Sequence, residues 1–256
     1  MENLKIKRVK NIRGFDGLVN KDGLKFKENF FFRSSKLYKL RKKDKRKLIE
    51  YTHIKEVIDL RTDGEVEEKP DTMLEGIKYI RMPIYSDSML GISREKKNYF
   101  KVDKIFEMRD VYASLTDEEY LVNFKNVIER ILNEEDKPLL FHCTEGKDRT
   151  GIISLILLSI LDFKEEDIID DYLYTNKINR RRAIKYYWLI RILLFNKKLA
   201  KNVKDMTLAK LEFIEAFTDS INEKFGSFEK FIRDYLGIDD RKKEELKEKY
   251  LVKCEL

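Results

Sequence analysis

The chain has 256 residues, and 42% of them are hydrophobic. This length and composition suit one α/β domain with a sizeable core and argue against an intrinsically disordered chain. Its 54 Lys and Arg exceed its 47 Asp and Glu by seven, and such a small excess in a chain rich in both signs favours acidic partners only weakly. No stretch approaches the roughly 18 consecutive apolar residues of a membrane-spanning helix, so the composition argues against an integral membrane protein.

Cysteine usage indicates the compartment. Only Cys143 and Cys254 occur, far apart in the chain, so no disulfide framework is predicted and a reducing environment is the default. The N-terminal residues show no apolar run of signal-peptide length. We therefore expect a cytoplasmic protein, with secretion left open in case a leader sequence has been removed.

The first third of the chain begins with paired glycines and a turn at 20–23, which predict a small hairpin, and continues with a strand at 29–34. Nine basic residues and one acid, Asp44, then lie between Arg33 and Lys47. This run is either a solvated helix face, the commoner case and the one we favour, or a basic collar for phosphorylated substrates or anionic lipid. Asp44 is predicted to cap a short helix.

Two further strands are predicted at 54–60 and 76–84, the first with the β-branched composition of a strand buried in a parallel sheet. Asp59 and Arg61 fall at its carboxyl end, the edge where open α/β sheets place their sites. They either orient a neighbouring loop and touch substrate or form a structural ion pair. Asp87 follows the second strand on a loop.

The segment before the centre of the chain is harder to interpret. A helix is predicted at 102–112, and a second helix is predicted to start at the Thr116-x-x-Glu119 capping box and to reach about residue 132. We interpret residues 89–114 as a mobile flap near the site.

The stretch 138–161 carries the chemistry. A short apolar strand ends at His142, a long apolar helix begins after Arg149, and a tight loop joins them. Such a loop aims backbone N–H groups and the positive end of the helix dipole at one point, which suits an anion. Cys143 opens the loop, in a setting that favours thiolates, and Arg149 offers a planar fork for phosphate oxygens. The implied reaction is attack of sulfur on a phosphoryl group.

The order His142-Cys143-x5-Arg149-Thr150 resembles the cysteine-dependent protein tyrosine phosphatases. Lys147 and Asp148 directly before the Arg resemble one bacterial and fungal subgroup, whose members act on phosphotyrosine and sometimes on phosphoserine, phosphothreonine or phosphoinositides. The resemblance extends to the Asp59-Leu60-Arg61 strand end and to an N-terminal Asn-x-Arg-Asp motif, here degraded because Gly14 takes the place of the Asp.

The resemblance implies roles for single residues. Cys143 is the expected nucleophile, Arg149 the phosphate clamp, and Thr150 a hydrogen-bond partner of the thiolate, while His142 orients the loop. Asp148 is the favoured general acid, and Asp87 is its rival by analogy with dual-specificity phosphatases. Lys147 adds a second cation that suits a multiply charged headgroup. The negative charge of Glu145 has the opposite effect on the binding of such a headgroup. The expected phosphate-binding loop comprises Thr144, Glu145, Gly146, Lys147, Asp148 and Arg149.

The carboxyl half is predicted to be wholly helical, with helices at 164–176, 177–198, 207–224, 227–236 and 239–251, two of them ended by Gly226 and Gly237. Three interpretations of the basic and aromatic helix at 177–198 are open: it packs in the core, it forms a lid over the site, or it lies on a membrane surface. An aromatic stripe at helical spacing is more often core. Because some members of the subgroup cover their sites with a helix pair here, residues 177–224 are a candidate lid.

The sequence thus predicts one α/β phosphatase domain over 1–256, with a central, mostly parallel sheet flanked by helices. Its expected reaction is phosphomonoester hydrolysis through a phosphocysteine, without metal or cofactor, on phosphorylated peptides or phosphoinositides; the alternative is a phosphate-binding module without turnover. Peripheral membrane contact is compatible with the composition, nucleic-acid binding is not expected, and the oligomeric state is left open.

Overall fold

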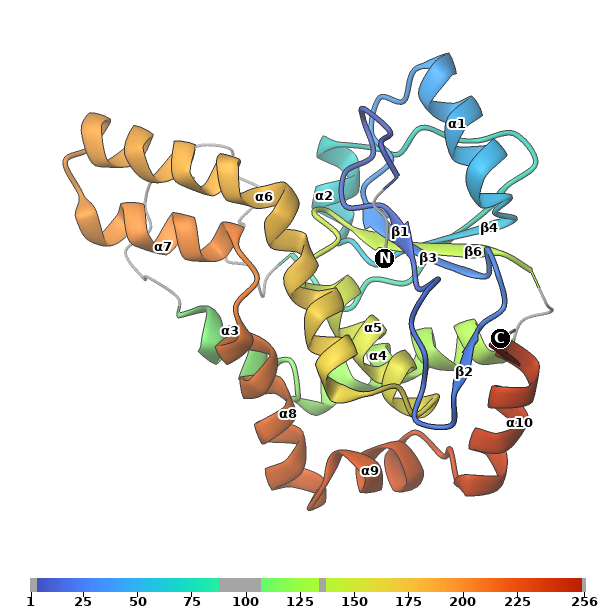
Figure 1. The fold of residues 1–256 in the computed structure, drawn as a ribbon. Coiled ribbons are helices and arrows are strands. Elements are labelled where there is room, and N and C mark those ends of the chain that lie inside the picture. The colour runs from blue at the N-terminus through green and yellow to red at the C-terminus, as the bar shows by residue number, and fades with distance from the viewer. Residues whose placement is uncertain (1–3, 88–106, 134–136, 255–256) are drawn as a thin grey trace.

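The computed structural model describes residues 4–87, 107–133 and 137–254. Its centre is a five-stranded sheet in the order β1-β3-β6-β4-β5 (Figure 1). Strand β1 pairs antiparallel with β3, and the other neighbours are parallel, so the predicted mostly parallel α/β sheet is confirmed. The strands are β1 Arg13–Gly14, β3 Phe31–Ser35, β6 Leu139–Cys143, β4 Glu56–Asp59 and β5 Lys78–Arg81.

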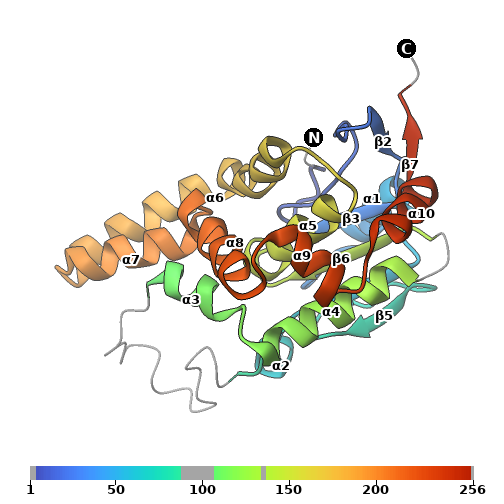
Figure 2. The ribbon, with the colours of Figure 1, turned by 90° about the horizontal axis from the view of Figure 1, so that it is seen from below.

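Helices cover both faces of the sheet, because alternate strand residues point to opposite sides. Leu140 of β6 packs in a core beside helix α1 (Lys42–Thr52), whereas Phe141 packs in the larger core on the other face. That larger core is formed with α4 (Glu118–Asn133) and α5 (Asp148–Ile160), which lie on the opposite side of the sheet from α1 (Figures 1 and 2). The strand that ends at the nucleophile candidate is therefore buried on both sides.

A single helix, α6 (Glu165–Leu193), occupies the region where two helices at 164–176 and 177–198 were predicted. The boundary was wrong because Asn176 resembles a helix-ending residue in the sequence. In the structure its side chain makes two hydrogen bonds with the backbone of Ala209, at 2.7 and 2.8 Å, and so fastens α6 to the chain after α7.

The rest of the carboxyl half is helical with shifted boundaries up to Tyr250, but the prediction that it is wholly helical is wrong, because residues 251–253 form a strand. Gly226 ends a helix in the left-handed conformation, with φ of 85°, as its position in the sequence indicated. The predicted helix at 227–236 is instead a short α-helix followed by a π-helical turn. The helices are α7 Lys197–Thr207, α8 Leu211–Phe225, α9 Phe228–Lys230, the π-helix η1 Phe231–Tyr235 and α10 Asp240–Tyr250.

The two ends of the chain meet in a small sheet that the sequence did not reveal. Strand β2 (Leu24–Phe26) pairs antiparallel with β7 (Leu251–Lys253), which directly follows α10. The predicted N-terminal hairpin is reduced to a turn closed by one bridge between Val19 and Lys25, because β2 finds its partner at the other end of the chain instead.

Helix α3 (Met108–Ser114) lies in the segment 89–114 that was interpreted as a flap, and residues 89–106 of that segment lie outside the described residues. The predicted capping box is not among the hydrogen bonds of the described residues: the backbone N–H of Thr116, which such a box would use, donates to the Ala113 carbonyl, and the first turn of α4 starts from the Asp117 carbonyl. A box of the same type forms earlier, where Thr62 and Glu65 cap the short helix α2 (Asp63–Glu68). None of the helices described is both long and apolar enough to cross a membrane.

Candidate active site

Cys143 is the last residue of β6, and α5 begins at Asp148, so residues 144–147 form the loop that the sequence predicted. Gly146 holds this loop against the end of β3. Its φ is +64°, and a Cβ atom there would lie 2.4 Å from the carbonyl oxygen of Ser34. Only glycine allows both this conformation and this approach. The loop therefore curls tightly between the carboxyl ends of two neighbouring strands.

Arg149 is buried and held from two sides. Its terminal nitrogens donate to the Glu65 carboxylate at 2.6 and 2.8 Å, and its guanidinium lies over the Tyr85 ring, 4.7 Å from the centroid. The remaining Nε–H of Arg149 and the Thr150 hydroxyl are buried without a hydrogen-bond partner among the described residues. Among the described residues, these two groups are therefore donors without a protein partner.

Glu65 is a site residue to which the sequence analysis assigned no role. The N-terminal box of α2 positions its carboxylate, which also accepts a hydrogen bond from Thr144 of the loop. Burial by itself raises the pKa of Glu65, but the hydrogen bonds and charge of Arg149 outweigh it and lower that pKa to about 2. The Thr62-x-x-Glu65 spacing directly after the Asp59-Leu-Arg61 strand end was the signal available in the sequence.

Asp148, the favoured acid, is the first residue of α5, and its side chain is 30% exposed. It accepts a hydrogen bond from the buried Tyr112 hydroxyl, which in turn lies 2.8 Å from the Tyr172 hydroxyl. Lys147 Nζ lies 3.2 Å from the same carboxylate. Asp148 thus combines solvent access with a fixed orientation.

Lys147 was expected to offer a second cation to a multiply charged substrate, but the structure places its ammonium group elsewhere. Its side chain is only 2% exposed, and its ammonium group donates to the carbonyls of Met206 and Leu208, at 2.7 and 2.9 Å. Together with the Asp148 contact, these bonds engage all three donors of the ammonium group. Lys147 connects the loop to the chain between α7 and α8.

Asp87, the rival acid, is attached to α2. Its two carboxylate oxygens lie 3.0 and 3.3 Å from the backbone nitrogen of Gly64, one of the orphan donors of that helix's first turn. Asp87 therefore stabilises the helix that presents Glu65.

The outer side of the loop is fastened by the N-terminal segment and by α6. Asn11 and Arg33 both donate to the Gly146 carbonyl, at 2.7 and 2.9 Å. Asp171 of α6 is buried between Arg33 and Arg13 and lies 2.8 Å from the Arg13 Nε. Burial raises the pKa of Asp171, but the two guanidinium groups outweigh this effect and lower it. The degraded Asn11-x-Arg13 motif thus still reaches the loop, and no pattern in the sequence singled out Asp171.

His142, Asp59 and Arg61 form a buried network behind the loop. Arg61 lies between Asp59 and Asp71, with contacts of 2.7 and 2.9 Å, and His142 Nε2 lies 2.9 Å from Asp71. Burial opposes the charged imidazole, but the carboxylates of Asp71 and Asp59 raise the pKa of His142 overall. The two acids and the His are spaced closely enough for a metal ion, but the Arg61 cation between the acids makes the cluster a poor metal site.

The other loop contacts come from the basic run at 33–47 and from α6. Lys36 of the basic run donates from Nζ to the Thr144 carbonyl at 3.1 Å. Arg182 of α6 forms an ion pair with Glu145. Within the same run, Asp44 caps α1 through the backbone N–H of Arg41. Most of the remaining basic side chains are exposed: Lys39, Arg41, Lys42, Lys43, Arg46 and Lys47. The run is therefore a solvated face apart from Arg33 and Lys36.

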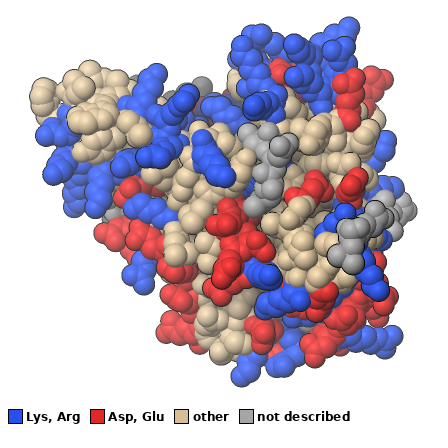
Figure 3. Space-filling model, viewed as in Figure 1, with Lys and Arg blue, Asp and Glu red and all other residues tan. Residues whose placement is uncertain are grey.

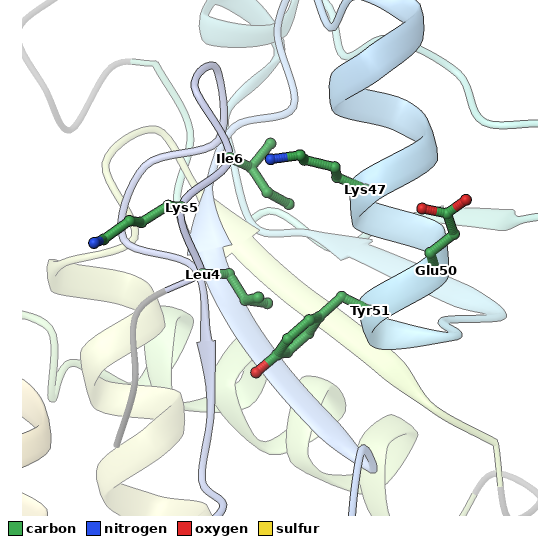
Figure 4. A pocket seen from close by; sticks show the side chains of 6 residues that line it. All are labelled: Leu4, Lys5, Ile6, Lys47, Glu50 and Tyr51. Atoms are coloured by element: carbon green, nitrogen blue, oxygen red, sulfur yellow. The ribbon is translucent and has the colours of Figure 1, made fainter.

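A separate groove lies between the N-terminal segment and α1 (Figure 4). Leu4, Ile6 and Tyr51 face into it, while the Lys5 side chain points away. Its lining contains no cysteine and no counterpart of the Cys143 loop, so the chemistry belongs to the site described above.

Comparison with known proteins agrees with this geometry. A sequence model described as the tyrosine phosphatase family matches residues 4–252, nearly the whole chain. The chain belongs to this family. The resemblance of the Cys143 loop to cysteine-dependent tyrosine phosphatases is confirmed, and the chain is accordingly a phosphatase.

Named relatives carry the same assignment. A protein of Cupriavidus necator named as a tyrosine-protein phosphatase is 23% identical over 90% of this chain and 83% of its own length. A tyrosine-protein phosphatase of Nostoc commune is 33% identical over 45% of this chain. The triple specificity protein phosphatase PtpB of Mycobacterium tuberculosis is 30% identical over 38% of this chain. These two matches each cover 38% of the relative.

Among solved structures, the core catalytic domain of the PP-IP phosphatase SIW14 from S. cerevisiae, in complex with citrate, aligns with 84% of this chain and 92% of its own. The TM-score is 0.36 and the sequence identity 16%.

Proposed function

We propose that the chain hydrolyses phosphomonoesters through a phosphocysteine intermediate on Cys143, with phosphotyrosine as its principal substrate. The observation that carries the proposal is the juxtaposition of Cys143 with a curled loop and with the buried Arg149, whose Nε–H has no partner in the described part of the chain. A thiolate beside a helix N-terminus and a fixed guanidinium is suited to attack on phosphorus.

The proposed reaction has two steps. In the first, the Cys143 sulfur forms a bond to phosphorus while the bond from phosphorus to the leaving oxygen breaks, and Asp148 gives that oxygen its proton. In the second, Asp148 takes a proton from water, whose oxygen attacks phosphorus and releases inorganic phosphate and the thiolate. The loop amides and Arg149 stabilise the equatorial oxygens in both transition states. Thr150 supports the departing sulfur with its unpaired hydroxyl.

Asp148 is our choice for the acid because its side chain reaches solvent beside the loop and is oriented by Tyr112. Asp87 is engaged with the backbone of Gly64. A carboxylic acid that already serves a helix terminus is less available for proton transfer to a leaving group.

The two acids are distinguished by Asp148→Asn and Asp87→Asn, assayed on aryl phosphates of rising leaving-group pKa. A good leaving group needs no proton, whereas a poor one does, so the true acid variant slows progressively along the series. We expect Asp148→Asn to lose about 100-fold in kcat on the poorest leaving groups and Asp87→Asn to show a profile parallel to wild type. A flat profile for Asp148→Asn, with a steep one for Asp87→Asn, would reverse the assignment.

Substrate range follows as part of the same proposal. The name of the mycobacterial relative indicates a phosphatase of several specificities, and we infer that this chain also accepts phosphoserine, phosphothreonine or phosphoinositides. A panel of phosphotyrosine peptide, phosphoserine peptide and phosphoinositides measures the relative kcat/KM values. Rapid acid quenching during turnover should trap phosphate on Cys143. If no phosphocysteine and no phosphate release are detected with any substrate, the chain is a binding module.

A further inference from the structure

The carboxyl-terminal part of α6, the connection after it and the first two turns of α7 form a helical hairpin, which we call the α6–α7 paddle (residues 180–204); Asp205 follows in the last turn of α7, where it pairs with Lys210. Its two helices lie side by side and project away from the sheet and its covering helices (Figures 1 and 2). The hairpin is joined to the rest of the described chain at its base.

The tip exposes large apolar side chains. Phe195, at the connection, is 82% exposed, and Leu193 and Ile192 before it are 66% and 61% exposed. One turn back, Trp188 is 56% exposed and Leu189 47%. The space-filling view shows an uncharged surface at the upper left, at the end of the hairpin (Figure 3). Soluble proteins rarely expose so many large apolar residues together without a partner.

The same segment is strongly basic. Between residues 180 and 204 the sequence contains no Asp or Glu and nine Lys or Arg, more positive charge than the whole chain carries net. Figure 3 shows blue side chains beside the uncharged tip. The basic residues are Arg180, Arg181, Arg182, Lys185, Arg191, Lys197, Lys198, Lys201 and Lys204.

We propose that the α6–α7 paddle docks on the surface of a bilayer that contains anionic lipids. Apolar side chains at the end of a basic helical hairpin suit insertion about 5–10 Å into the boundary between headgroups and acyl chains, while the cations meet lipid phosphates. The placement of Trp188 agrees with the preference of Trp for that boundary. This inference is independent of the proposed reaction, since it concerns binding and not turnover.

Charge favours a bilayer over another copy of this chain. Two tips packed together would bring the cations next to the tip, Arg191, Lys197 and Lys198, of both copies into one interface, and the sequence between 180 and 204 offers no acid to offset their repulsion. An anionic surface offers the complementary charge, and each Lys or Arg near it adds to the attraction.

The base of the paddle is joined directly to the phosphate loop. Arg182 of α6 pairs with Glu145, and Lys147 donates to the Met206 and Leu208 carbonyls at the end of α7. A docked paddle would therefore hold the Cys143 loop close to the bilayer, where phosphorylated headgroups and the phosphorylated tails of membrane proteins are concentrated.

Trp188 provides the measurement, because it is the only tryptophan in the chain. Titration of the full-length protein with phosphatidylcholine vesicles containing phosphatidylserine should shift its emission to the blue, and brominated acyl chains should quench it. Vesicles of phosphatidylcholine alone should produce a much weaker response. No shift with the anionic vesicles, or an equal shift with both kinds, would overturn the proposal.

Two pairs of variants assign the binding to the paddle. Lys197→Gln/Lys198→Gln/Lys201→Gln should weaken partitioning about 100-fold. Lys42→Gln/Lys43→Gln/Lys47→Gln, with the same change of net charge on exposed positions of α1, should weaken it far less. Phe195→Ser should weaken it at least about ten-fold, whereas Met73→Ser, a 63% exposed control away from the paddle, should leave it unchanged.

Equal losses for a paddle variant and its control would contradict the assignment. Far-ultraviolet circular dichroism checks that each variant is folded. Two further measurements test other binding partners of the tip. Light scattering without vesicles detects a dimer, and a dimer that Phe195→Ser disperses would identify the tip as a contact between copies. A separate titration with single-stranded RNA tests for a nucleic-acid surface, which tight binding by the paddle would identify. Either result, without vesicle binding, rejects the lipid proposal.

Discussion

At the scale of single residues, the site depends on how Arg149 is held. A guanidinium on a flexible side chain loses conformational freedom whenever it binds phosphate, and here Glu65 and Tyr85 restrict it in advance. The Nε–H is left unpaired in the described region, so the arginine is fixed while one of its donors stays available. The same ion pair makes Glu65 a source of pH-dependent stability.

The variant Glu65→Gln tests whether the Glu65 carboxylate makes the free energy of unfolding depend on pH. The pKa of Glu65 is about 2 in the folded protein and near 4.3 in an unfolded chain, so the unfolded state binds more protons between these values. The contribution of the carboxylate, on the order of 3 kcal/mol, is present above about pH 4.5 and is lost as the pH falls towards 2. We expect a shallower fall in the free energy of unfolding over that range in Glu65→Gln, measured by urea denaturation.

The exposed Glu67→Gln is the control, and its pH dependence should match wild type. Because Arg149 also loses a charged partner in Glu65→Gln, kcat should fall about ten-fold or more at neutral pH. Identical acid limbs for Glu65→Gln and wild type would mean that the ion pair does not contribute to stability.

At the scale of elements, the catalytic loop is shaped by the contact between β6 and β3. Parallel pairing places Cys143 opposite Ser35, and the chain must then turn within four residues into α5. Gly146 makes this possible because its backbone approaches that of Ser34 closely. The loop geometry is thus a property of two strands and a helix together.

Gly146→Ala should therefore be more harmful than a change at an ordinary positive-φ glycine. Gly237 has φ of +73° and open space around its Cα, so Gly237→Ala introduces only the backbone strain, about 1–2 kcal/mol. Gly146→Ala introduces a similar strain and also displaces the loop from Ser34. We expect a loss of more than about 100-fold in kcat for Gly146→Ala only. Thermal unfolding and turnover of an aryl phosphate measure both effects, and equal behaviour of the two variants would refute the close-contact argument.

At the scale of the whole molecule, distant segments converge on the loop. The N-terminal Asn11, β3 through Arg33, and α6 through Asp171 all meet at the Gly146 carbonyl or at the residues that bind it. Asp171 is the centre of this arrangement, because it neutralises two buried guanidinium groups. Removing its charge would leave both cations in a region without solvent.

Asp171→Asn should accordingly lower the free energy of unfolding by about 3–5 kcal/mol, the usual cost of breaking a buried ion pair from one side. Urea denaturation with an unchanged m-value is the measurement. The neighbouring Asp170 is exposed, and Asp170→Asn should change stability by less than about 0.5 kcal/mol. If both variants unfold at the same urea concentration, the Asp171 cluster is not a stabilising centre.

The sequence by itself determined the parallel strands, the helical carboxyl half and the Cys143 to Arg149 loop, because these features are encoded in contiguous residues. Apolar runs specify buried strands, and Cys, Gly, Arg and Thr lie at fixed short spacings in one segment. Gly226 was identifiable as a helix end for the same local reason.

Only the tertiary structure decided which residues support that loop. Glu65 and Asp171 belong to other helices than Arg149, and their roles arise from the order in which strands and helices pack. The same holds for Lys147, whose partners lie at the end of α7, for the continuous α6, whose Asn176 binds Ala209, and for β7, whose partner lies near the N-terminus. Long-range hydrogen bonds and ion pairs overrode local preference at each of these positions, because burial makes an unpaired polar group more costly than a shifted helix boundary.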